Sequence, residues 1–282
     1  MRRLALFLLV LVGTFCVAPE SISAAGGAKP SRIVSLNLCT DQLLLHLVPA
    51  PRIAAVTALA QDPRMSATAA AASSLPAHGG SAEEIMTLEP DLILAGTYSA
   101  QPTVRLLRQL GYSVERIPVA FSLDEIQANI RAVAAAVGEP ERGETLSRGL
   151  ARRFAALRPG AKKERPLAAL YWANGFTSGR GTLASEIVEA AGFRSLGKEL
   201  GLSGIAPLPM ERLLMAAPDA LVIGRQQGAP SLATEMLNHR ALREAFGEVR
   251  RVSVPDHLWT CGTPAVAAAA EHLARFREAL PE

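Results

Sequence analysis

Two segments of the chain, residues 83–96 and residues 211–224, share one pattern of apolar and polar positions. In each segment, apolar residues at helical spacing are followed by Pro-Asp and then by an apolar run that ends in Gly. Such a pattern predicts a short helix that breaks and leads into a buried strand. The chain therefore reads as two related α/β halves, and the cleft expected between two such lobes is a usual place for a small ligand.

The same alternation extends through the rest of the first half. Apolar runs and turn residues predict the following elements: a strand over 32–36, a helix capped by Thr40 that passes Leu47, a strand over 53–56, a helix over 103–110 and a strand over 113–117. The Ala/Ser-rich stretch 67–74 is left without an assignment. Strands that alternate with helices predict a parallel sheet covered by helices.

After Pro118 the pattern becomes helical for almost forty residues, with one helix through Ile126 and Val137 and a second through Leu146 and Leu157. A polar, proline-bounded stretch over 159–166 then suggests a domain boundary. The second half is predicted to contain a strand over 167–172, helices over 182–191 and 232–246, a strand over 249–254 and a closing helix over 264–280. The predicted organisation is a signal peptide over 1–25, an N-terminal lobe over 30–139, a connecting helix over 140–160 and a C-terminal lobe over 161–282.

The first 25 residues have the features of a cleavable secretory signal. Arg2-Arg3 precedes an apolar run over 4–12 that is short for a membrane span, and Ser23-Ala24-Ala25 fits a signal-peptidase site. A lipid anchor on Cys16 is disfavoured because Phe15 and Gly13 stand where a small residue and a leucine are wanted. We expect a soluble periplasmic protein.

Removal of this segment leaves 257 residues, with 27 of the 29 basic and 25 of the 26 acidic side chains. Such a balance argues against a nucleic-acid partner, which requires a clustered basic face. About half of the residues are apolar, so a large core is available. Only Cys39 and Cys261 remain as cysteines, which excludes a disulfide-dense scaffold and permits one long-range bridge.

Taken in order, several motifs resemble the periplasmic substrate-binding proteins of cobalamin- and iron-siderophore-type ABC importers. The motifs are Arg32-Ile33-Val34-Ser35-Leu36, the pattern from Glu83 to Ile93, the single long connecting helix, Phe176-Thr177-Ser178-Gly179 before a helix, and the loop from Asp256 to Pro264. The resemblance covers the whole mature chain. It implies two Rossmann-like lobes joined by one helix, a small closure on cargo, a monomer, and delivery of a metal chelate to an ABC permease and its ATPase at the inner membrane.

The resemblance also gives a role to the glutamates at matching positions of the two segments. It implies that Glu83 and Glu211 dock onto arginines of the permease, where paired carboxylates far apart on one face set the orientation of the complex. A structural alternative remains open, because Ser81-x-x-Glu84 is a capping box and acidic residues are favoured in the first turn of any helix.

Ligand contacts are expected in the loops that follow the carboxyl ends of the strands, because parallel sheets bind ligands there. The candidate residues are Asn37, Cys39, Thr40, Thr97, Tyr98, Trp172, Asn174, Phe176, Arg225, His257, Trp259 and Cys261. Aromatic residues at loop ends suit a flat or apolar cargo such as a corrin ring or a chelate shell. Arg225 is a candidate partner for an anionic chelate or, equally, an exposed surface residue.

Three interpretations of the cysteine pair stay open: a bridge across the lobes, a contact with a soft metal or corrin, and two unrelated buried thiols. The bridge is disfavoured because it would lock the lobes together. No intrinsic cofactor and no bare-metal site are expected, since the five histidines do not converge. A haem carrier remains an alternative through Tyr98 or His257 as axial ligand.

An enzyme is the less favoured alternative from a different class. No Gly-x-Gly-x-x-Gly follows Leu36, and no Gly-x-Ser-x-Gly occurs. Residues 175–181 contain three glycines, but their spacing does not match a phosphate-binding loop and no Lys-Ser/Thr follows them. The sequence therefore predicts capture of an iron chelate, a corrinoid or haem, with no covalent chemistry.

Overall fold

The computed structural model describes residues 28–157, 164–224 and 232–281. Its first part contains β1 (Ile33–Ser35), α1 (Leu38–Leu47), η1 (Ala50–Arg52), β2 (Ile53–Thr57), η2 (Ala58–Gln61), α2 (Ala69–Ala72), β3 (Ala77–His78), α3 (Ala82–Thr87), β4 (Leu92–Gly96), α4 (Gln101–Gln109) and β5 (Val114–Ile117). Two longer helices follow, α5 (Leu123–Ala136) and α6 (Pro140–Ala156).

The second part starts with β6 (Leu167–Tyr171), η3 (Ala173–Gly175), β7 (Phe176–Ser178), α7 (Leu183–Ala190), β8 (Arg194–Ser195), α8 (Leu196–Glu199) and β9 (Ile205–Pro207). It continues with α9 (Met210–Met215), β10 (Ala220–Gly224), α10 (Leu232–Glu235), η4 (Met236–Asn238), α11 (Arg240–Phe246), β11 (Arg251–Val254), η5 (Asp256–Leu258) and α12 (Val266–Glu278).

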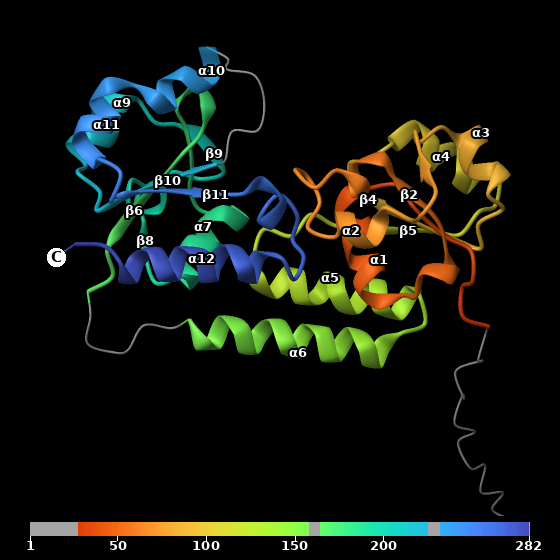
Figure 1. Ribbon diagram of the computed structural model, residues 1–282. Coiled ribbons are helices and arrows are strands. Elements are labelled where there is room, and N and C mark those ends of the chain that lie inside the picture. The colour runs from red at the N-terminus through yellow and green to blue at the C-terminus, as the bar shows by residue number, and fades with distance from the viewer. Residues whose placement is uncertain (1–27, 158–163, 225–231, 282) are drawn as a thin grey trace, which may run out of the picture.

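The strands form two parallel sheets, one in each lobe (Figure 1). The order is β3-β2-β1-β4-β5 in the first lobe and β11-β10-β6-β8 in the second, and each neighbouring pair is parallel. A small antiparallel pair, β7 with β9, accompanies the second sheet. The predicted α/β class with two lobes is confirmed.

The duplicated pattern corresponds to duplicated structure. Helix α3 and strand β4 form the first copy, and α9 and β10 form the second. Glu89 and Ala217, at matching positions, both adopt the left-handed conformation, with φ of 46° and 43°. The next aspartates also act alike, because Asp91 accepts from the Ser31 N–H at 2.6 Å and Asp219 accepts from the Leu167 N–H at 2.7 Å. Each copy therefore fixes the start of the first strand of its own lobe.

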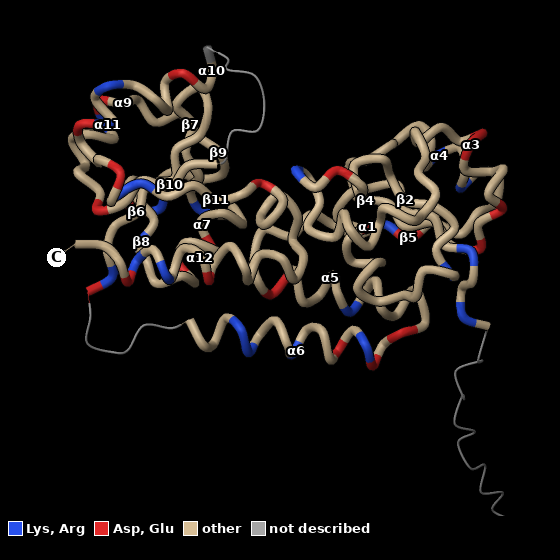
Figure 2. The backbone as a smooth tube through the Cα atoms, viewed as in Figure 1, with Lys and Arg blue, Asp and Glu red and all other residues tan. Residues whose placement is uncertain are grey.

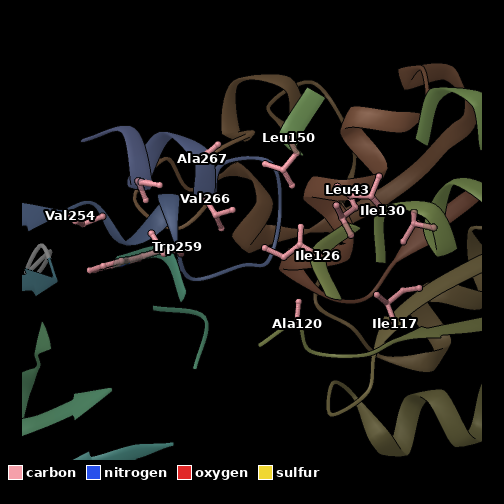
Figure 3. Packing of buried hydrophobic residues seen from close by; sticks show 14 of the residues in the cluster. Leu43, Ile117, Ala120, Ile126, Ile130, Leu150, Val254, Trp259, Val266 and Ala267 are labelled. Atoms are coloured by element: carbon pink, nitrogen blue, oxygen red, sulfur yellow. The ribbon is translucent and has the colours of Figure 1, made fainter. Parts of the chain in front are cut away.

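One hydrophobic cluster crosses from lobe to lobe (Figure 3). It includes Leu43 of α1, Ile126 and Ile130 of α5, and Val266 of α12, all at most 2% exposed. Separate clusters fill the outer faces of the two sheets. The lobes thus share buried apolar surface at their base, which favours a fixed mutual position.

Helix α6 runs along the base of the molecule, antiparallel to α5 and below α12 (Figure 1). The Arg153 guanidinium donates to both carboxylate oxygens of Glu271 on α12, at 2.7 and 2.9 Å. This bidentate pair fastens α6 to the second lobe. The domain limits predicted from the sequence remain a prediction, and part of the proposed boundary lies outside the described residues.

Several predicted elements differ in detail. Thr40 does not cap α1; the side chain of Asn37 does, by accepting from the N–H groups of Cys39 and Thr40. The helix predicted over 232–246 is divided into α10, η4 and α11, because His239 takes a non-helical conformation with a ψ of 141° and caps α11 with its own ring nitrogen. The short elements β3, β7, β8, β9 and α8 were not predicted, since two to four residues carry too little periodic pattern.

Two remaining points concern the proposed signal peptide and the question of membrane-spanning helices. The proposed signal peptide lies outside the described residues. Of the helices in the described ranges, none has both the length and the apolar character needed to cross a bilayer.

Candidate functional site

A cavity of about 850 Å³ lies between the lobes. Its walls come from the residues that follow β1, β4 and β5 in the first lobe, and from those that follow β6 and β11 in the second. These are the carboxyl ends of parallel strands, where α/β folds bind their ligands. The volume falls within the range of small-molecule sites, roughly 300–1,000 Å³.

Most of the predicted contact residues line this cavity, namely Asn37, Cys39, Thr40, Thr97, Tyr98, Trp172, Phe176 and Trp259. Three described candidates do not. Asn174 is exposed in a tight turn with a φ of 57°, His257 lies in η5 outside the lining, and Cys261 is buried behind it. Arg225 lies outside the described residues. Direct contact of any of these side chains with cargo remains a prediction.

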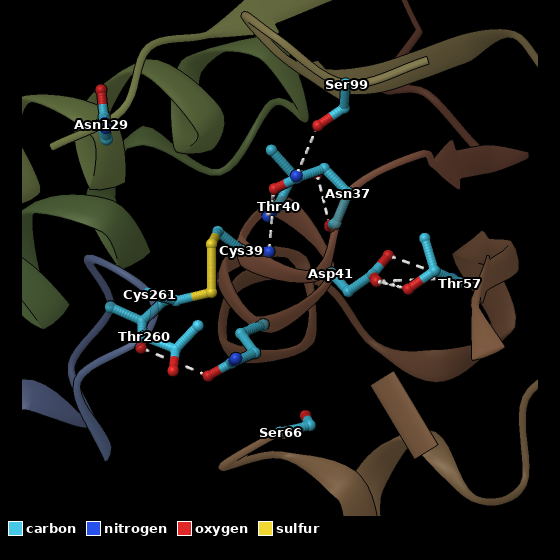
Figure 4. The surroundings of a disulfide bond; sticks show 12 residues. Asn37, Cys39, Thr40, Asp41, Thr57, Ser66, Ser99, Asn129, Thr260 and Cys261 are labelled. Carbon is cyan, nitrogen blue, oxygen red and sulfur yellow. Dashed lines mark hydrogen bonds between the residues drawn. A yellow bond between two sulfur atoms is a disulfide. The ribbon is translucent and has the colours of Figure 1, made fainter. Parts of the chain in front are cut away.

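The polar side chains near the N-terminus of α1 already have partners (Figure 4). Asn37 Oδ1 accepts from the Cys39 N–H at 2.9 Å, and its Nδ2 donates to Ser99 Oγ at 2.6 Å. Thr40 Oγ1 donates to the Asn37 carbonyl at 2.9 Å, and Thr40 is only 1% exposed. These residues therefore shape the wall, and their hydrogen-bonding capacity is largely used within the protein.

The tryptophans form one wall in the second lobe. The rings of Trp172 and Trp259 meet edge to face, with centroids 5.1 Å apart. Trp172 Nε1 donates to Ser178 Oγ at 3.0 Å, which fixes the plane of its ring. Trp259 is 7% exposed and belongs to the shared core, so it supports the cavity more than it faces into it.

Large apolar side chains with unusual exposure gather at the cavity. Tyr98 is 78% exposed and Ile205 68%, and the other members of this group are Val119, Phe121 and Phe176. An exposed apolar patch of this kind marks a binding surface. Val119, Phe121 and Ile205 are not among the contact residues predicted from the sequence. The apolar residues directly after Pro118 were a usable signal, but they were read only as a break between elements.

The lining is almost uncharged. Asp256 is its one charged residue within the described part of the chain. Burial raises the pKa of the Asp256 carboxyl, against a hydrogen bond from Trp259 and the nearby His257, which both lower it. Among the described residues, no three His, Cys, Asp or Glu side chains lie close enough together to hold a metal ion.

The cysteine pair forms a disulfide, so the sequence-based interpretation that disfavoured a bridge between the lobes is wrong. Cys39 at the start of α1 is bonded to Cys261 in the segment before α12, with Cα atoms 5.2 Å apart (Figure 4). A cleft was expected to separate these loops, whereas the lobes meet here: Thr263 Oγ1 donates to Gln42 Oε1 at 3.3 Å, and Gly262 lies against Ala120.

The two glutamates singled out from the repeat are both exposed on short helices, Glu83 on α3 and Glu211 on α9. These helices lie in different lobes and on the side away from α6, and both carry acidic residues (Figure 2). Half of the predicted capping box is present, since Ser81 Oγ accepts from the Glu84 N–H, while the Glu84 carboxylate accepts from Gly79.

Comparisons with known proteins agree with this architecture. A cobalamin-binding protein of Halobacterium salinarum is 24% identical over 202 residues, covering 70% of this chain and 54% of the relative. The chain thus spans about half the length of the curated relatives it matches.

Solved structures are similar over nearly the whole chain. A periplasmic heme-binding protein of Roseiflexus sp. RS-1 in apo form has a TM-score of 0.70 at 24% identity, covering 88% of this chain and 99% of that one. A periplasmic vitamin B12 binding protein of Vibrio cholerae has a TM-score of 0.66 at 20% identity, covering 89% and 97%. At such identities these likenesses establish the fold.

The family described as periplasmic binding protein matches residues 33–245, from the first strand of one lobe to the last helix before β11 of the other. That match covers most of the chain, and it includes the whole first sheet, every strand of the second sheet except β11, and most of the residues that line the cavity. The chain therefore belongs to the periplasmic binding protein family, whose members bind solutes and are not enzymes.

Proposed function

We propose that this protein captures a metal chelate in the periplasm, with a corrinoid as the best-supported cargo, and delivers it to an ABC permease and its ATPase. The observation that carries the proposal is the cavity itself, which is large, placed between the lobes and walled by exposed apolar side chains. Aromatic rings such as Phe121 and Phe176 offer flat surfaces to a macrocycle or a chelate shell.

The charge of the lining supports a corrinoid over strongly anionic cargo. A corrin ring carries neutral amide side chains, whereas haem carries two propionates and catecholate chelates carry several negative charges. Asp256 is the one charged group that the described lining offers, and a carboxylate repels anions. Curated relatives named for cobalamin binding point in the same direction.

Haem is the second candidate, because of Tyr98. This side chain is 78% exposed and lines the cavity, and a tyrosine oxygen is a known axial ligand of haem iron. Several structures with similar folds are named as heme-binding proteins. The propionates would then need a cation that the described lining does not supply.

The test is a calorimetric titration of residues 26–282 with cyanocobalamin, a ferric hydroxamate chelate and haemin. We expect saturable binding of cyanocobalamin, and a loss of about 1–3 kcal/mol in the binding free energy when Phe121 or Phe176 is replaced by Ala. Leu110→Ala is the matched control, because Leu110 is 52% exposed and lies outside the cavity.

Each result decides between the candidates. Binding of haemin alone, with a Soret shift that Tyr98→Phe removes, would replace the corrinoid by haem. Failure of all three compounds to bind would overturn the proposal of a metal-chelate cargo.

Docking on the permease is proposed to use Glu83 and Glu211. Both carboxylates are exposed, and they are carried by the two copies of the repeated helix-strand segment in different lobes. Two such charges can pair with two guanidinium groups and thereby fix one orientation of the complex.

A further inference from the structure

The Cys39–Cys261 disulfide is placed asymmetrically with respect to the cavity. Cys39 is partly exposed and lines the cavity, whereas Cys261 is 1% exposed and lies outside the lining. A reagent in the cavity therefore meets Cys39 before Cys261. Because access decides which sulfur of a disulfide is attacked, the two cysteines are chemically distinct.

The bridge also holds one wall of the cavity. Trp259, Thr260 and Gly262 all line the cavity, and all belong to the short segment between η5 and α12 that contains Cys261. Other ties of this segment to the first lobe include the 3.3 Å hydrogen bond from Thr263 to Gln42 and the packing of Gly262 against Ala120 and Ile126. Neither is covalent, so the bridge is the strongest constraint on this wall.

We propose that the disulfide is a thiol-exchange site reached through the cargo cavity, and that it acts as a removable clamp on the wall formed by residues 259–263. Its reaction partner is a dithiol that is small enough to enter the cavity, or that has a segment narrow enough to do so. The inference holds for any cargo, since it depends on the position of the sulfurs and not on the identity of the bound chelate.

The chemistry balances as an ordinary exchange. One thiolate of the dithiol attacks Cys39 Sγ, which forms a mixed disulfide and expels the Cys261 thiolate, which then takes up a proton. The second thiolate of the dithiol attacks its partner sulfur in the mixed disulfide and releases the Cys39 thiolate. Two electrons pass from the dithiol to the bridge, and the dithiol leaves as a disulfide. The positive end of the α1 dipole stabilises the Cys39 thiolate in this last step.

The position of the reactive sulfur is tested with a matched pair of variants, Cys261→Ser and Cys39→Ser, each of which leaves one free thiol. We expect iodoacetamide to alkylate Cys39 about tenfold or more faster than Cys261 under native conditions, because only Cys39 faces the cavity. Equal rates, or faster alkylation of Cys261, would overturn the assignment.

A second measurement uses the wild-type protein and so does not depend on the folding of the variants. The protein is treated with glutathione, quenched with N-ethylmaleimide and mapped by mass spectrometry. Glutathione on Cys39 and maleimide on Cys261 is the expected pattern. The reverse pattern, or reduction only in denaturant, contradicts the proposal.

The clamp is tested by hydrogen exchange on the oxidised protein and on the protein reduced with dithiothreitol. Faster exchange in residues 259–263, with β6 and β10 unchanged, is expected after reduction. Unchanged exchange in this segment would show that the bridge does not hold the wall. Neither outcome depends on the cargo titration, so failure of this inference and failure of the proposed function can be told apart.

Discussion

Single residues of the first lobe, near its contact with the second, stabilise the structure more than they bind ligand. Asp41 is the clearest case, since it is fully buried in α1 and accepts from Thr57 Oγ1 at 2.5 Å. Burial raises the pKa of Asp41 from 3.8 to about 7, against hydrogen bonds from Thr57 and Ser35 that lower it. The folded protein therefore retains a proton on Asp41 at pH values where the unfolded chain has lost it.

This difference in proton binding gives a pH-dependent stability with a definite sign. The unfolding free energy should fall as the pH rises from about 4 to about 7, because the folded state binds the additional proton. Asp41→Asn keeps an acceptor for Thr57 but cannot ionise. Between pH 5 and pH 8, Asp41 should lower the unfolding free energy of the wild type by about 2–3 kcal/mol. The Asp41→Asn variant should lack this decrease.

Urea unfolding at the two pH values measures this effect. Asp124→Asn is a suitable control, because Asp124 is exposed in the first turn of α5. An unchanged pH dependence in Asp41→Asn would show that Asp41 is ionised in the folded protein.

At the level of elements, the two copies of the repeat do the same work in each lobe. The aspartate after the helix break holds the backbone at the start of the neighbouring strand, Asp91 for β1 and Asp219 for β6. The copies are not equal, however. Asp91 accepts from the Ser31 N–H, the Ser31 hydroxyl and the Arg32 N–H, whereas Asp219 accepts from the Leu167 N–H.

Because Asp91 accepts more hydrogen bonds than Asp219, the same substitution should lower the unfolding free energy by different amounts at the two positions. Asp91→Ala should lower the unfolding free energy by about 1.5–3 kcal/mol, since it removes a charged acceptor with several donors. Asp219→Ala should cost less, about 1 kcal/mol. Chemical denaturation of both variants measures the difference, and a larger cost for Asp219→Ala would contradict the argument.

For the whole molecule, the shared core and the disulfide hold the two lobes together, and the outer helices α3 and α9 carry exposed carboxylates. Helices α3 and α9 lie away from this base, on the side opposite α6 (Figure 1). A partner that contacts both helices would bridge the two lobes.

The docking proposal predicts a loss of uptake without a loss of binding. The double substitution Glu83→Arg and Glu211→Arg should abolish transport of the cargo, because each guanidinium would then face another cation. Cargo affinity should stay unchanged, since neither glutamate lines the cavity.

Transport in cells that depend on this protein, combined with calorimetry, separates the two effects. Glu115→Arg with Glu248→Arg is the matched control, because both residues are exposed, one in each lobe, and the change in net charge is the same. Normal uptake by the Glu83/Glu211 variant would refute the docking role.

Local pattern was sufficient for the fold and for many of the residues that line the cavity. The repeat over 83–96 and 211–224, together with apolar runs bounded by Pro and Gly, determined the two α/β lobes, and the rule that ligands bind at the carboxyl ends of strands placed Tyr98, Trp172 and Phe176 at the cavity. These inferences succeed because helical and strand periodicity are properties of neighbouring residues.

Only the tertiary structure decided which distant segments meet. Cys39 and Cys261 are 222 residues apart, and their bridge depends on the packing of α1 against the segment before α12. The roles of Val119, Phe121 and Ile205 likewise depend on which side chains stay uncovered once the lobes are assembled. Contacts of this kind arise from chain topology and side-chain packing, which the order of apolar and polar residues along the sequence does not encode locally.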